Sequence, residues 1–576
     1  MPVPGLFALL RMLLNKHSMN RREAIKRTAL SLGGLATIPA ALGLTGCTPG
    51  SRSNIGGTSA LIGGVSKGTY FNNVTELRNT PGEMGETAFL AGYHEVNDGG
   101  GSEIYWDSDS TESDDNGMVF KADGVNRGRW KRPNIGYISV KWFGARGDGI
   151  NRPGRDNDVN YFDDCFKWIA NNSIKKIYVP KGQYIFDHRI PTRPNSNHNG
   201  LEFYGDGDES ELKLADKLDT SDTAPLWMLA FDSNSNTGVP LKDIYIHDLL
   251  FNGNRKGHGL THYERTGYGL YLIGTSNLPA GEESKNIRVA RVSSINHTTS
   301  GGQIRSSNTV VTDWFATGTY VHGISTNGNP ENVLIKNLKA YKCGEGRGYG
   351  LDFSAGNHLT LDGFDIDGCY QGYKNSVGAQ NITLKNGTIR NSIYRSMDQS
   401  GSTNAGSIKY ENVIIDNNQG ASRWNVAQVI TLDKFSSTNI THPNDTSKAG
   451  LYINTGIKKF NANDLTITNA EECGIRLWAE EANLSNLNID GAKGGIQGRS
   501  GGNNVTINGG IMKNCGNECI HIRGGNWNIS NVTFEGRLAL RVDSGASVNV
   551  SGCNFSKVSN NNSGSGQVYY GSGNTM

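Results

Sequence analysis

A short phrase of a small, an apolar and a polar residue recurs between Gly318 and Asp398, and it constrains the fold more than any other feature of the chain. A second phrase, an apolar residue followed by polar residues with Asn or Gly, begins at Ile335, Leu361 and Leu384, at intervals of 26 and 23 residues. Periods in the low twenties with two or three such alternations are typical of solenoids. The sequence therefore predicts an all-β fold, a parallel β-helix.

The second phrase continues toward the C-terminus and allows the coils to be counted. The 52-residue gap between Tyr410 and Ala462 is wide enough for two coils with an insertion near Ser436–Lys448. Because parallel strands stack about 4.8 Å apart, residues in one phase of the repeat should form a column on the outside. The phrase begins at Leu361, Leu384, Tyr410, Ala462, Leu484, Ile507, Ile529 and Val550.

Composition agrees with a solenoid and excludes other classes. The chain has 576 residues, of which 76 are Gly, and 19% are charged. A solenoid lengthens by adding coils, so this length does not require several domains. Abundant Gly suits corners with positive φ and argues against a coiled coil or a disordered chain. The net charge of +2 indicates no nucleic-acid partner, so any electrostatic recognition must come from local clusters.

The first 46 residues have the organisation of a secretory signal. Basic residues around Arg21-Arg22 precede an apolar run from Ala29 to Leu44, which is too short to remain as a membrane span. The paired arginines resemble a twin-arginine signal, and residues 44–47 resemble a lipobox in which Cys47 would be lipidated. A chance Arg-Arg pair before an ordinary cleavage site is the alternative. We expect an exported protein, lipid-anchored to the cell envelope at the outer membrane or surface, in a periplasmic or extracellular location.

Four further regions follow the signal. Residues 47–68 are polar and are predicted to form a tether. In residues 69–134, aromatic and polar residues alternate between Gly and Asp clusters, which indicates a small N-terminal β module. The β-helix is predicted over residues 135–556 and a flexible polar tail over residues 557–576.

The segment that starts at Val140 resembles a known family. Val140-Lys141-Trp142-Phe143-Gly144 leads through Gly147-Asp148-Gly149 to a predicted helix over Tyr161–Ala170 and then to Ile177-Tyr178-Val179-Pro180. This order resembles the first coil of the pectate-lyase-like superfamily of right-handed parallel β-helices, which includes polysaccharide lyases, glycoside hydrolases, uronan epimerases and phage tailspikes. The Gly-rich module ahead of it resembles the segment that precedes this coil in tailspike-type relatives. The short helix would cap the open end of the first coil, but a fold does not determine a reaction.

The polar residues of the first phrase form one predicted column. It is rich in cations on a nearly neutral chain, so it could match an anionic polysaccharide, because Arg suits carboxylate and sulfate groups. Aromatic residues beside it could stack on sugar rings. The alternative is that exposed strands simply carry long polar residues. The column runs through Tyr271, Arg305, Ser325, Asp352, Lys374, Arg395, Tyr452, Arg476, Gln497, His521 and Arg541. The substrate-binding candidates are Tyr271, Tyr394, Arg476, Trp478 and His521.

The middle of this column is the predicted catalytic centre. Neighbouring cations could lower the pKa of Lys374 and make it a base, and Asp352 beside it would be held ionised. A cation that neutralises a uronate carboxylate, a base and an acid are the parts that β-elimination needs. The family resemblance implies the same chemistry. The catalytic candidates are Lys374, Arg395, Asp352, Arg305, Tyr349 and His322.

Two other functions stay open beside a lyase acting on a uronate or sulfated polysaccharide. Glycoside hydrolysis needs two carboxylates roughly 5–9.5 Å apart, whereas the predicted column holds only Asp352, with Asp398, Asp313 or Asp433 as residues that could approach. A non-catalytic carbohydrate-binding or surface-attachment role is the third function. Residues 349–352 also match, weakly, a Tyr-Gly-x-Asp motif of the uronan epimerases.

The histidine, carboxylate and cysteine patterns do not decide whether the protein binds a metal ion or forms a disulfide. His258 and His262 are four residues apart, but they lie in a Gly-rich stretch that disfavours a helix, so no metal pair is expected. Ca²⁺ could bind among the many Asp and Asn residues, although no EF-hand-like spacing appears. Cys343 and Cys369 share one phase of adjacent coils, so they form either a disulfide or two buried thiols.

Overall fold

The computed structural model describes residues 69–192, 194–216, 218, 226–232, 241–257, 267–273, 285–400, 406–441, 449–500 and 503–576. The predicted signal, the tether, the lipidation site at Cys47 and the pair His258 and His262 lie outside these residues. No helix in the described part of the chain has the length and apolar composition needed to cross a membrane.

A small mixed sheet forms the N-terminal module. β1 pairs with β2 in parallel, whereas the pairs β2–β3, β3–β5 and β4–β5 are antiparallel. Phe71, Leu77, Trp106 and Trp130 lie in its own small core. The predicted β module is therefore confirmed. Its elements are β1 (Thr69–Phe71), α3 (Val74–Arg78), β2 (Thr87–Leu90), β3 (Ser102–Asp107), β4 (Val119–Phe120) and β5 (Arg129–Lys131).

Helix α4 (Asp158–Ala170) packs on the first strands of the β-helix, as the predicted capping helix should. The side chain of Asn157 caps the helix by accepting from the Val159 amide at 3.2 Å. The Asp158 carboxylate ties the helix to β8 by accepting from the Ile185 amide at 3.0 Å, and the Phe162 ring packs edge-on against Tyr184. Nearby elements are β6 (Ile138–Ser139), β7 (Lys176–Val179), β8 (Gly182–Phe186), β9 (Glu202–Gly205), β10 (Ser210–Leu214) and the 3-10 helices Val140–Phe143, Gly154–Asp156, Ser196–His198 and Gly207–Glu209.

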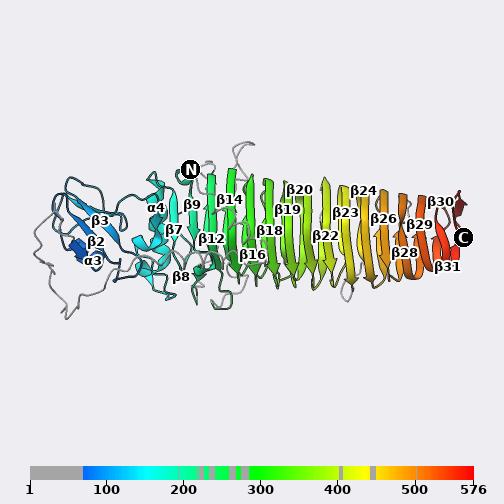
Figure 1. Ribbon diagram of the computed structural model, residues 1–576, viewed down its shortest axis with the longest axis horizontal. Helices are drawn as coiled ribbons and strands as arrows, with labels where there is room; N and C mark the ends of the chain where they lie inside the picture. Colours follow the sequence, from blue (N-terminus) through cyan, green and yellow to red (C-terminus); the bar gives the residue numbers. More distant parts are fainter. Residues whose placement is uncertain are drawn as a thin grey trace, which may run out of the picture. The chain divides into compact units, whose positions relative to one another are not determined.

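The following strands build the coils, and they succeed one another in chain order (Figure 1). Strands of successive coils pair in parallel. The strands are β11 (Leu226–Asp232), β12 (Lys242–Asn252), β13 (Gly267–Ile273), β14 (Lys285–Ile295), β15 (Gly302–Ile304), β16 (Thr309–Thr317), β17 (Ile324–Thr326), β18 (Glu331–Tyr341), β19 (Tyr349–Asp367), β20 (Gln371–Arg390), β21 (Arg395–Gln399), β22 (Ser407–Asp416), β23 (Ser422–Ile440), β24 (Ala449–Ala470), β25 (Cys473–Leu477), β26 (Glu481–Asp490), β27 (Gly494–Gly498), β28 (Asn503–Ile522), β29 (Gly525–Val542), β30 (Ala546–Ser551), β31 (Asn554–Ser563) and β32 (Gln567–Tyr570).

The strand register confirms the predicted parallel β-helix and its repeat. Leu361 pairs with Leu384 and Leu384 with Tyr410, and all three are fully buried. Leu432 lies in register between Tyr410 and Ala462, so the 52-residue gap holds two coils as predicted. The first residues of the predicted insertion, 436–440, belong to β23.

Each coil bends where the second phrase places Asn, Asp or Gly. Asn337, Asn386 and Asn412 have φ between 54° and 58°, a left-handed conformation that Asn tolerates better than most residues. The side-chain amide of Asn386 donates to Asp362 at 2.8 Å, and that of Asn412 donates to Asn386 at 3.2 Å. The repeated Asn of the sequence thus forms a ladder at one corner of the coils.

The C-terminal residues differ from the prediction. Residues 557–576 were expected to form a flexible tail, but β31 pairs with β29, and β32 pairs with β30. Most side chains of β31 and β32 are exposed. These strands therefore lack the alternation of apolar and polar residues by which the sequence predicts a strand. Val558 and Val568 nevertheless pack against the core.

Candidate functional site

One column of residues, the site column, follows the strands that contain the first phrase. The register fixes its members, because Gln303 pairs with Ser325, Ser325 with Asp352, and Asp352 with Lys374. In order, the column consists of Tyr271, Gln303, Ser325, Asp352, Lys374, Asp398, Arg423, Tyr452, Arg476, Gln497, His521 and Arg541.

Two predicted members of the column are wrong. Gln303, and not Arg305, lies between Tyr271 and Ser325. The preceding residue is Gly302, and the Trp314 ring fills the space of a side chain there, so the apolar residue of the phrase is missing. Asp398, and not Arg395, pairs with Lys374, whereas Arg395 pairs with Gln371 in a neighbouring column.

The centre of the site column alternates in charge as Asp352, Lys374 and Asp398. Two strand spacings, about 9.5 Å, separate the Cα atoms of the two aspartates. The side chains of Asp352 and Asp398 are only 6% and 9% exposed. Asp352 accepts hydrogen bonds from Ser354 at 2.6 Å and from Ser376 at 3.3 Å. Two nearly buried carboxylates around one ammonium group form an arrangement typical of acid–base sites.

Two aromatic rings lie beside this centre. The rings of His322 and Tyr349 stack with centroids 5.3 Å apart, and Nζ of Lys374 lies 4.9 Å from the Tyr349 centroid. Nε2 of His322 is 3.5 Å from a carboxylate oxygen of Asp352, while its Nδ1 has no hydrogen-bond partner among the described residues. Burial lowers the pKa of His322, so the ring is largely neutral at neutral pH. Burial also raises the pKa of Tyr349, an effect that Lys374 opposes.

Lys374 is a cation and not the deprotonated base that the sequence suggested. Burial alone would lower its pKa, but the Tyr349 side chain and the charges of Asp352 and Asp398 together raise the pKa above its ordinary value. The expectation of a lowered pKa is wrong because Asp398, and not Arg395, follows Lys374 in the column, so that both column neighbours of Lys374 are carboxylates.

Asp398 lies between two guanidinium groups. Nη1 of Arg395 is 3.3 Å from its Oδ1 atom, and Nε of Arg423 is 3.6 Å from the same atom. The Arg395 guanidinium also lies 4.6 Å from the centroid of the Tyr394 ring, which stacks on Tyr370 at 5.8 Å. Arg395 therefore reaches the centre although it belongs to a neighbouring column.

Further along the column, Arg476 lies beside two aromatic rings. Its guanidinium carbon is 5.8 Å from the Tyr452 centroid and 5.9 Å from the Trp478 centroid. The two rings meet edge-on at 5.2 Å. A cation with adjacent aromatic surface is suited to an anionic sugar.

The remaining candidates lie neither at the Asp352–Lys374–Asp398 centre nor beside Arg476. Nε2 of His521 lies 3.0 Å from Asp543, and Nδ1 lies 3.5 Å from Glu518, so both ring nitrogens contact carboxylates of the protein itself. Tyr271 holds its column position in β13. Arg305 follows β15 and lies against Gly328.

Sequence analysis missed Asp398 and Arg423 as column members. A signal for Asp398 exists, because Ser396-Met397-Asp398 has the small, apolar, polar order, and Met397 pairs with the buried Tyr373. Arg423 follows Ser422, a fully buried polar residue, so the apolar residue of the phrase is absent there.

The other candidate carboxylates and cysteines lie elsewhere. Asp313 accepts from Asn337 at a bend, and Asp433 belongs to a second face of the coils. Cys343 and Cys369 are buried free thiols, and the Cys343 amide lies 3.4 Å from the Cys369 sulfur. Within the described residues, no group of three or more His, Cys, Asp or Glu side chains could hold a metal ion.

The strand register alone defines the class, a parallel β-helix protein. A family model matches residues 70–135 and describes a phage tail protein small four-stranded beta-sheet domain. These residues contain β2–β5 and all but the first residue of β1. No curated protein sequence matches the chain.

Solved structures that resemble the chain share little sequence with it. The enzymatically active domain of tailspike protein 2 from bacteriophage CBA120 has 15% identity and a TM-score of 0.43, over 76% of this chain and 57% of that chain. WceF from Pantoea stewartii, described as a glycan biofilm modifying enzyme with a tailspike-like parallel β-helix fold, has 14% identity and a TM-score of 0.43, over 65% and 47% of the two chains. The A-module of the Azotobacter vinelandii mannuronan C-5 epimerase AlgE4 has 13% identity and a TM-score of 0.31, over 76% and 99%. The chain thus spans about half the length of the first two structures.

Proposed function

We propose that the protein is a polysaccharide-cleaving enzyme that hydrolyses glycosidic bonds at the centre of the site column. The observation that carries this proposal is the placement of Asp352 and Asp398 on either side of Lys374. Their backbone separation of about 9.5 Å leaves room for carboxyl groups at the spacing of about 6.5–9.5 Å that inverting glycosidases use.

The surroundings of the two carboxylates suggest their roles. Arg395 and Arg423 flank Asp398 and favour its ionised form, so Asp398 is the base that takes a proton from water. The water oxygen bonds to the anomeric carbon while the bond to the leaving oxygen breaks, and Asp352, which must first take up a proton from solvent, gives that proton to the leaving oxygen. Lys374 stays charged and provides a fixed cation for the substrate between them.

The cations favour an anionic substrate. Lys374, Arg395 and Arg423 surround the proposed point of cleavage, and Arg476 with its two aromatic neighbours offers a further subsite along the same column. We propose a uronate or sulfated polysaccharide, since guanidinium groups match carboxylate and sulfate oxygens in pairs.

β-Elimination is the second candidate, and the contact between Tyr349 and Lys374 favours it. Burial raises the pKa of Tyr349 and the Lys374 charge works against that rise, and the phenolate form could remove the proton next to a uronate carboxylate that Arg395 neutralises. In this reaction the sugar ring gains a double bond as the leaving oxygen departs.

Product analysis separates these reactions. The protein is incubated with alginate, pectate and sulfated galactans, and reducing ends and the ultraviolet absorbance of unsaturated sugars are followed together. Hydrolysis gives reducing ends without new absorbance and is lost in Asp398→Asn. New absorbance instead supports elimination and contradicts hydrolysis, whereas retention of a polysaccharide without any product supports a binding role and contradicts an enzyme.

We also propose that the protein is exported and anchored by a lipid on Cys47. The support is the order of the basic segment, the apolar run and the lipobox-like residues 44–47. Metabolic labelling with a fatty acid should mark the wild-type protein in the membrane fraction. Cys47→Ala should lose the label, and a labelled Cys47→Ala protein would contradict the proposal.

A further inference from the structure

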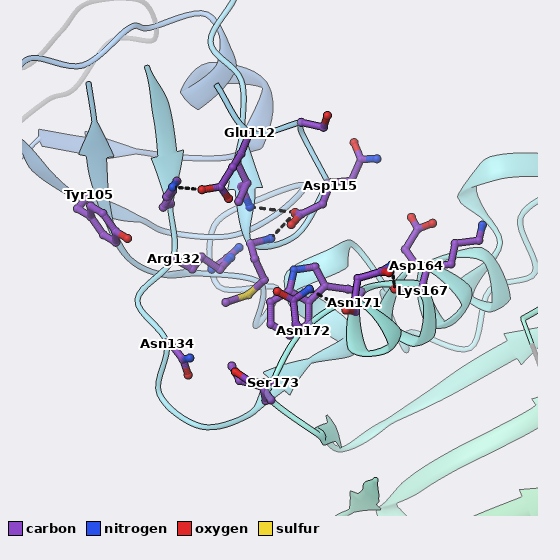
Figure 2. A pocket seen from close by; sticks show the side chains of 17 residues that line it. Tyr105, Glu112, Asp115, Arg132, Asn134, Asp164, Lys167, Asn171, Asn172 and Ser173 are labelled. Carbon is purple, nitrogen blue, oxygen red and sulfur yellow. Dashed lines mark hydrogen bonds and ion pairs between the residues drawn. The ribbon is translucent and has the colours of Figure 1, made fainter. Parts of the chain in front are cut away.

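A cavity lies between the N-terminal module and helix α4, and none of its lining residues belongs to the site column (Figure 2). Its volume is about 630 Å³, within the range of about 300–1,000 Å³ that ligand pockets occupy. Strands β3 and β5, the loop over residues 112–118 and Val119 of β4 line one side, and the second half of α4 with residues 171–174 lines the other. The cavity is therefore a separate candidate site.

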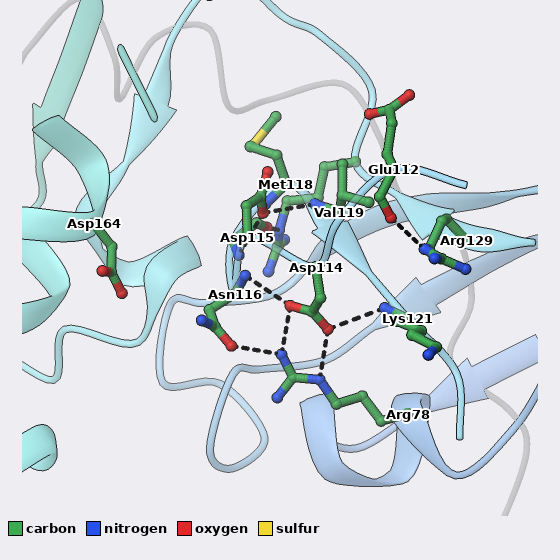
Figure 3. Close-up of polar contacts among 12 residues, drawn as sticks. Arg78, Glu112, Asp114, Asp115, Asn116, Met118, Val119, Lys121, Arg129 and Asp164 are labelled. Carbon is green, nitrogen blue, oxygen red and sulfur yellow. Dashed lines mark hydrogen bonds and ion pairs between the residues drawn. The ribbon is translucent and has the colours of Figure 1, made fainter. Parts of the chain in front are cut away.

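The loop wall of this cavity is held in place by polar contacts (Figure 3). Arg78 donates to both carboxylate oxygens of Asp114, at 3.1 and 2.9 Å, and to Asn116 at 2.8 Å. The carboxylate of Asp115 accepts from three successive backbone amides of the loop at 2.7–2.9 Å. A wall ordered before the ligand arrives reduces the conformational entropy that binding costs.

The buried guanidinium of Arg132 joins this loop to the start of β3. It donates to the carbonyl oxygens of Gly117 and Gly100, each at 2.7 Å, and also to the Ser102 hydroxyl. Burial lowers the pKa of Arg132 to about 9. Each of its three nitrogens thus donates to the protein, and Arg132 acts as a support of the wall.

The other charged side chains of the cavity also have partners in the protein. Three acidic and three basic residues line it, so the charges balance. Glu112 pairs with Lys131, Asp164 pairs with Arg155, and Lys167 lies 2.6 Å from Asp163. Because the charges balance, the lining has no excess charge that would attract an ionic ligand, and a neutral ligand leaves these partly exposed pairs in place.

The side chains that remain for a ligand are aromatic rings and amides. Tyr105 is 40% exposed, and Trp168 is partly buried on the opposite side. The amide nitrogens of Asn171 and Asn172 donate to carbonyl oxygens of α4 at 2.9 and 2.7 Å, which fixes the orientation of these side chains. Asn134 lies exposed at the rim (Figure 2). Amides donate to and accept from hydroxyl groups, and aromatic faces pack on the apolar side of sugar rings.

We propose that this cavity binds a short neutral oligosaccharide. The balanced and internally paired charges give the cavity no excess of cations like that of the site column, and the rings and amides match the apolar faces and hydroxyl groups of neutral sugars. The protein would then hold a glycan at two places with different chemistry.

Calorimetric titration of the full chain tests the proposal. The probes are cellotetraose, maltotetraose, mannotetraose and galactotetraose, with tetragalacturonate as the charged comparison. At least one neutral probe should bind, and Tyr105→Ala and Asn134→Ala should each weaken it about tenfold, a loss of about 1.4 kcal/mol. Tyr70→Ala is the matched control, because Tyr70 is an exposed tyrosine of the same sheet that does not line the cavity.

Two further measurements make the outcome decisive. Asp398→Asn should bind the neutral probe as the wild type does, so failure of the proposed hydrolysis does not affect this result. Asn134→Ala, at an exposed position, keeps the test valid if Tyr105→Ala unfolds. The proposal is overturned if no neutral probe binds, if both variants bind it as tightly as the wild type, or if their loss is confined to tetragalacturonate.

Discussion

Two columns of side chains on different faces of the coils carry the same alternation of charge. The site column contains Asp352, Lys374 and Asp398 in register. The second column alternates in the same way through Lys336, Asp362, Lys385 and Glu411, and then continues with a second carboxylate, Asp433.

The two columns differ in burial and in their neighbours. The side chains of Asp362 and Lys385 are 27% and 35% exposed and lie 3.4 Å apart, whereas those of Asp352 and Asp398 are 6% and 9% exposed. Aromatic rings and guanidinium groups surround the centre of the site column. Charge alternation alone stabilises neighbouring strands. When alternating charges are buried among groups that change their protonation, they indicate a functional site.

The largest expected difference between the columns is in activity. Asp398→Asn should lower kcat by about 10²- to 10⁴-fold, the usual contribution of an acid–base group. Asp362→Asn should leave kcat unchanged, because Asp362 contacts Asn386 and Lys385 on the other face. Rates of reducing-end formation on the substrate that the product assay identifies measure both. Equal rates for the two variants would remove the distinction between the columns.

A smaller difference is expected in stability. Lys374→Met leaves two nearly buried carboxylates without their shared cation, so it should lower the free energy of unfolding by about 2–4 kcal/mol. Lys385→Met removes one cation of an exposed pair and should cost about 0–1 kcal/mol. Denaturant unfolding of both variants and the wild type gives the comparison. A smaller cost for Lys374→Met than for Lys385→Met would contradict the burial argument.

These columns also show how much the sequence could predict. The fold followed from the spacing of Leu361, Leu384 and Tyr410, because an apolar residue must face the core once per coil and the period is therefore preserved. The predictions failed where the inward residue was not apolar, as at Gly302 and Ser422, since the core there is filled by Trp314 or accepts a buried hydroxyl.

The same limit applies to the chemistry of the site. Arg395 was placed beside Lys374, but a shift of three residues brings Asp398 there and reverses the direction of the Lys374 pKa shift. A pKa depends on the neighbours that the register selects, so an error in phase changes the predicted reaction. The sequence could not predict the cavity beside α4, because its lining residues come from the N-terminal module and from a helix, and neither belongs to the repeat of the coils.

The smallest expected effect is on the pH dependence of stability. The pKa of His322 is lowered by burial and by Lys374, against the opposing charge of Asp352. The unfolded chain therefore binds a proton at this residue at a higher pH than the folded chain does. The stability from the neutral ring is fully present above about pH 6.5 and is lost as the pH falls toward the folded pKa.

His322→Asn should therefore reduce the loss of unfolding free energy between about pH 7 and pH 5. The slope of unfolding free energy against pH should fall by an amount that corresponds to less than one bound proton. The matched control is His358→Asn, since His358 is exposed and Asn tolerates its φ of 54°. Urea unfolding at several pH values compares the two variants with the wild type. A slope that His322→Asn leaves unchanged would show that the folded protein protonates this ring as readily as the unfolded chain, and the neutral His322 beside Asp352 would have to be abandoned.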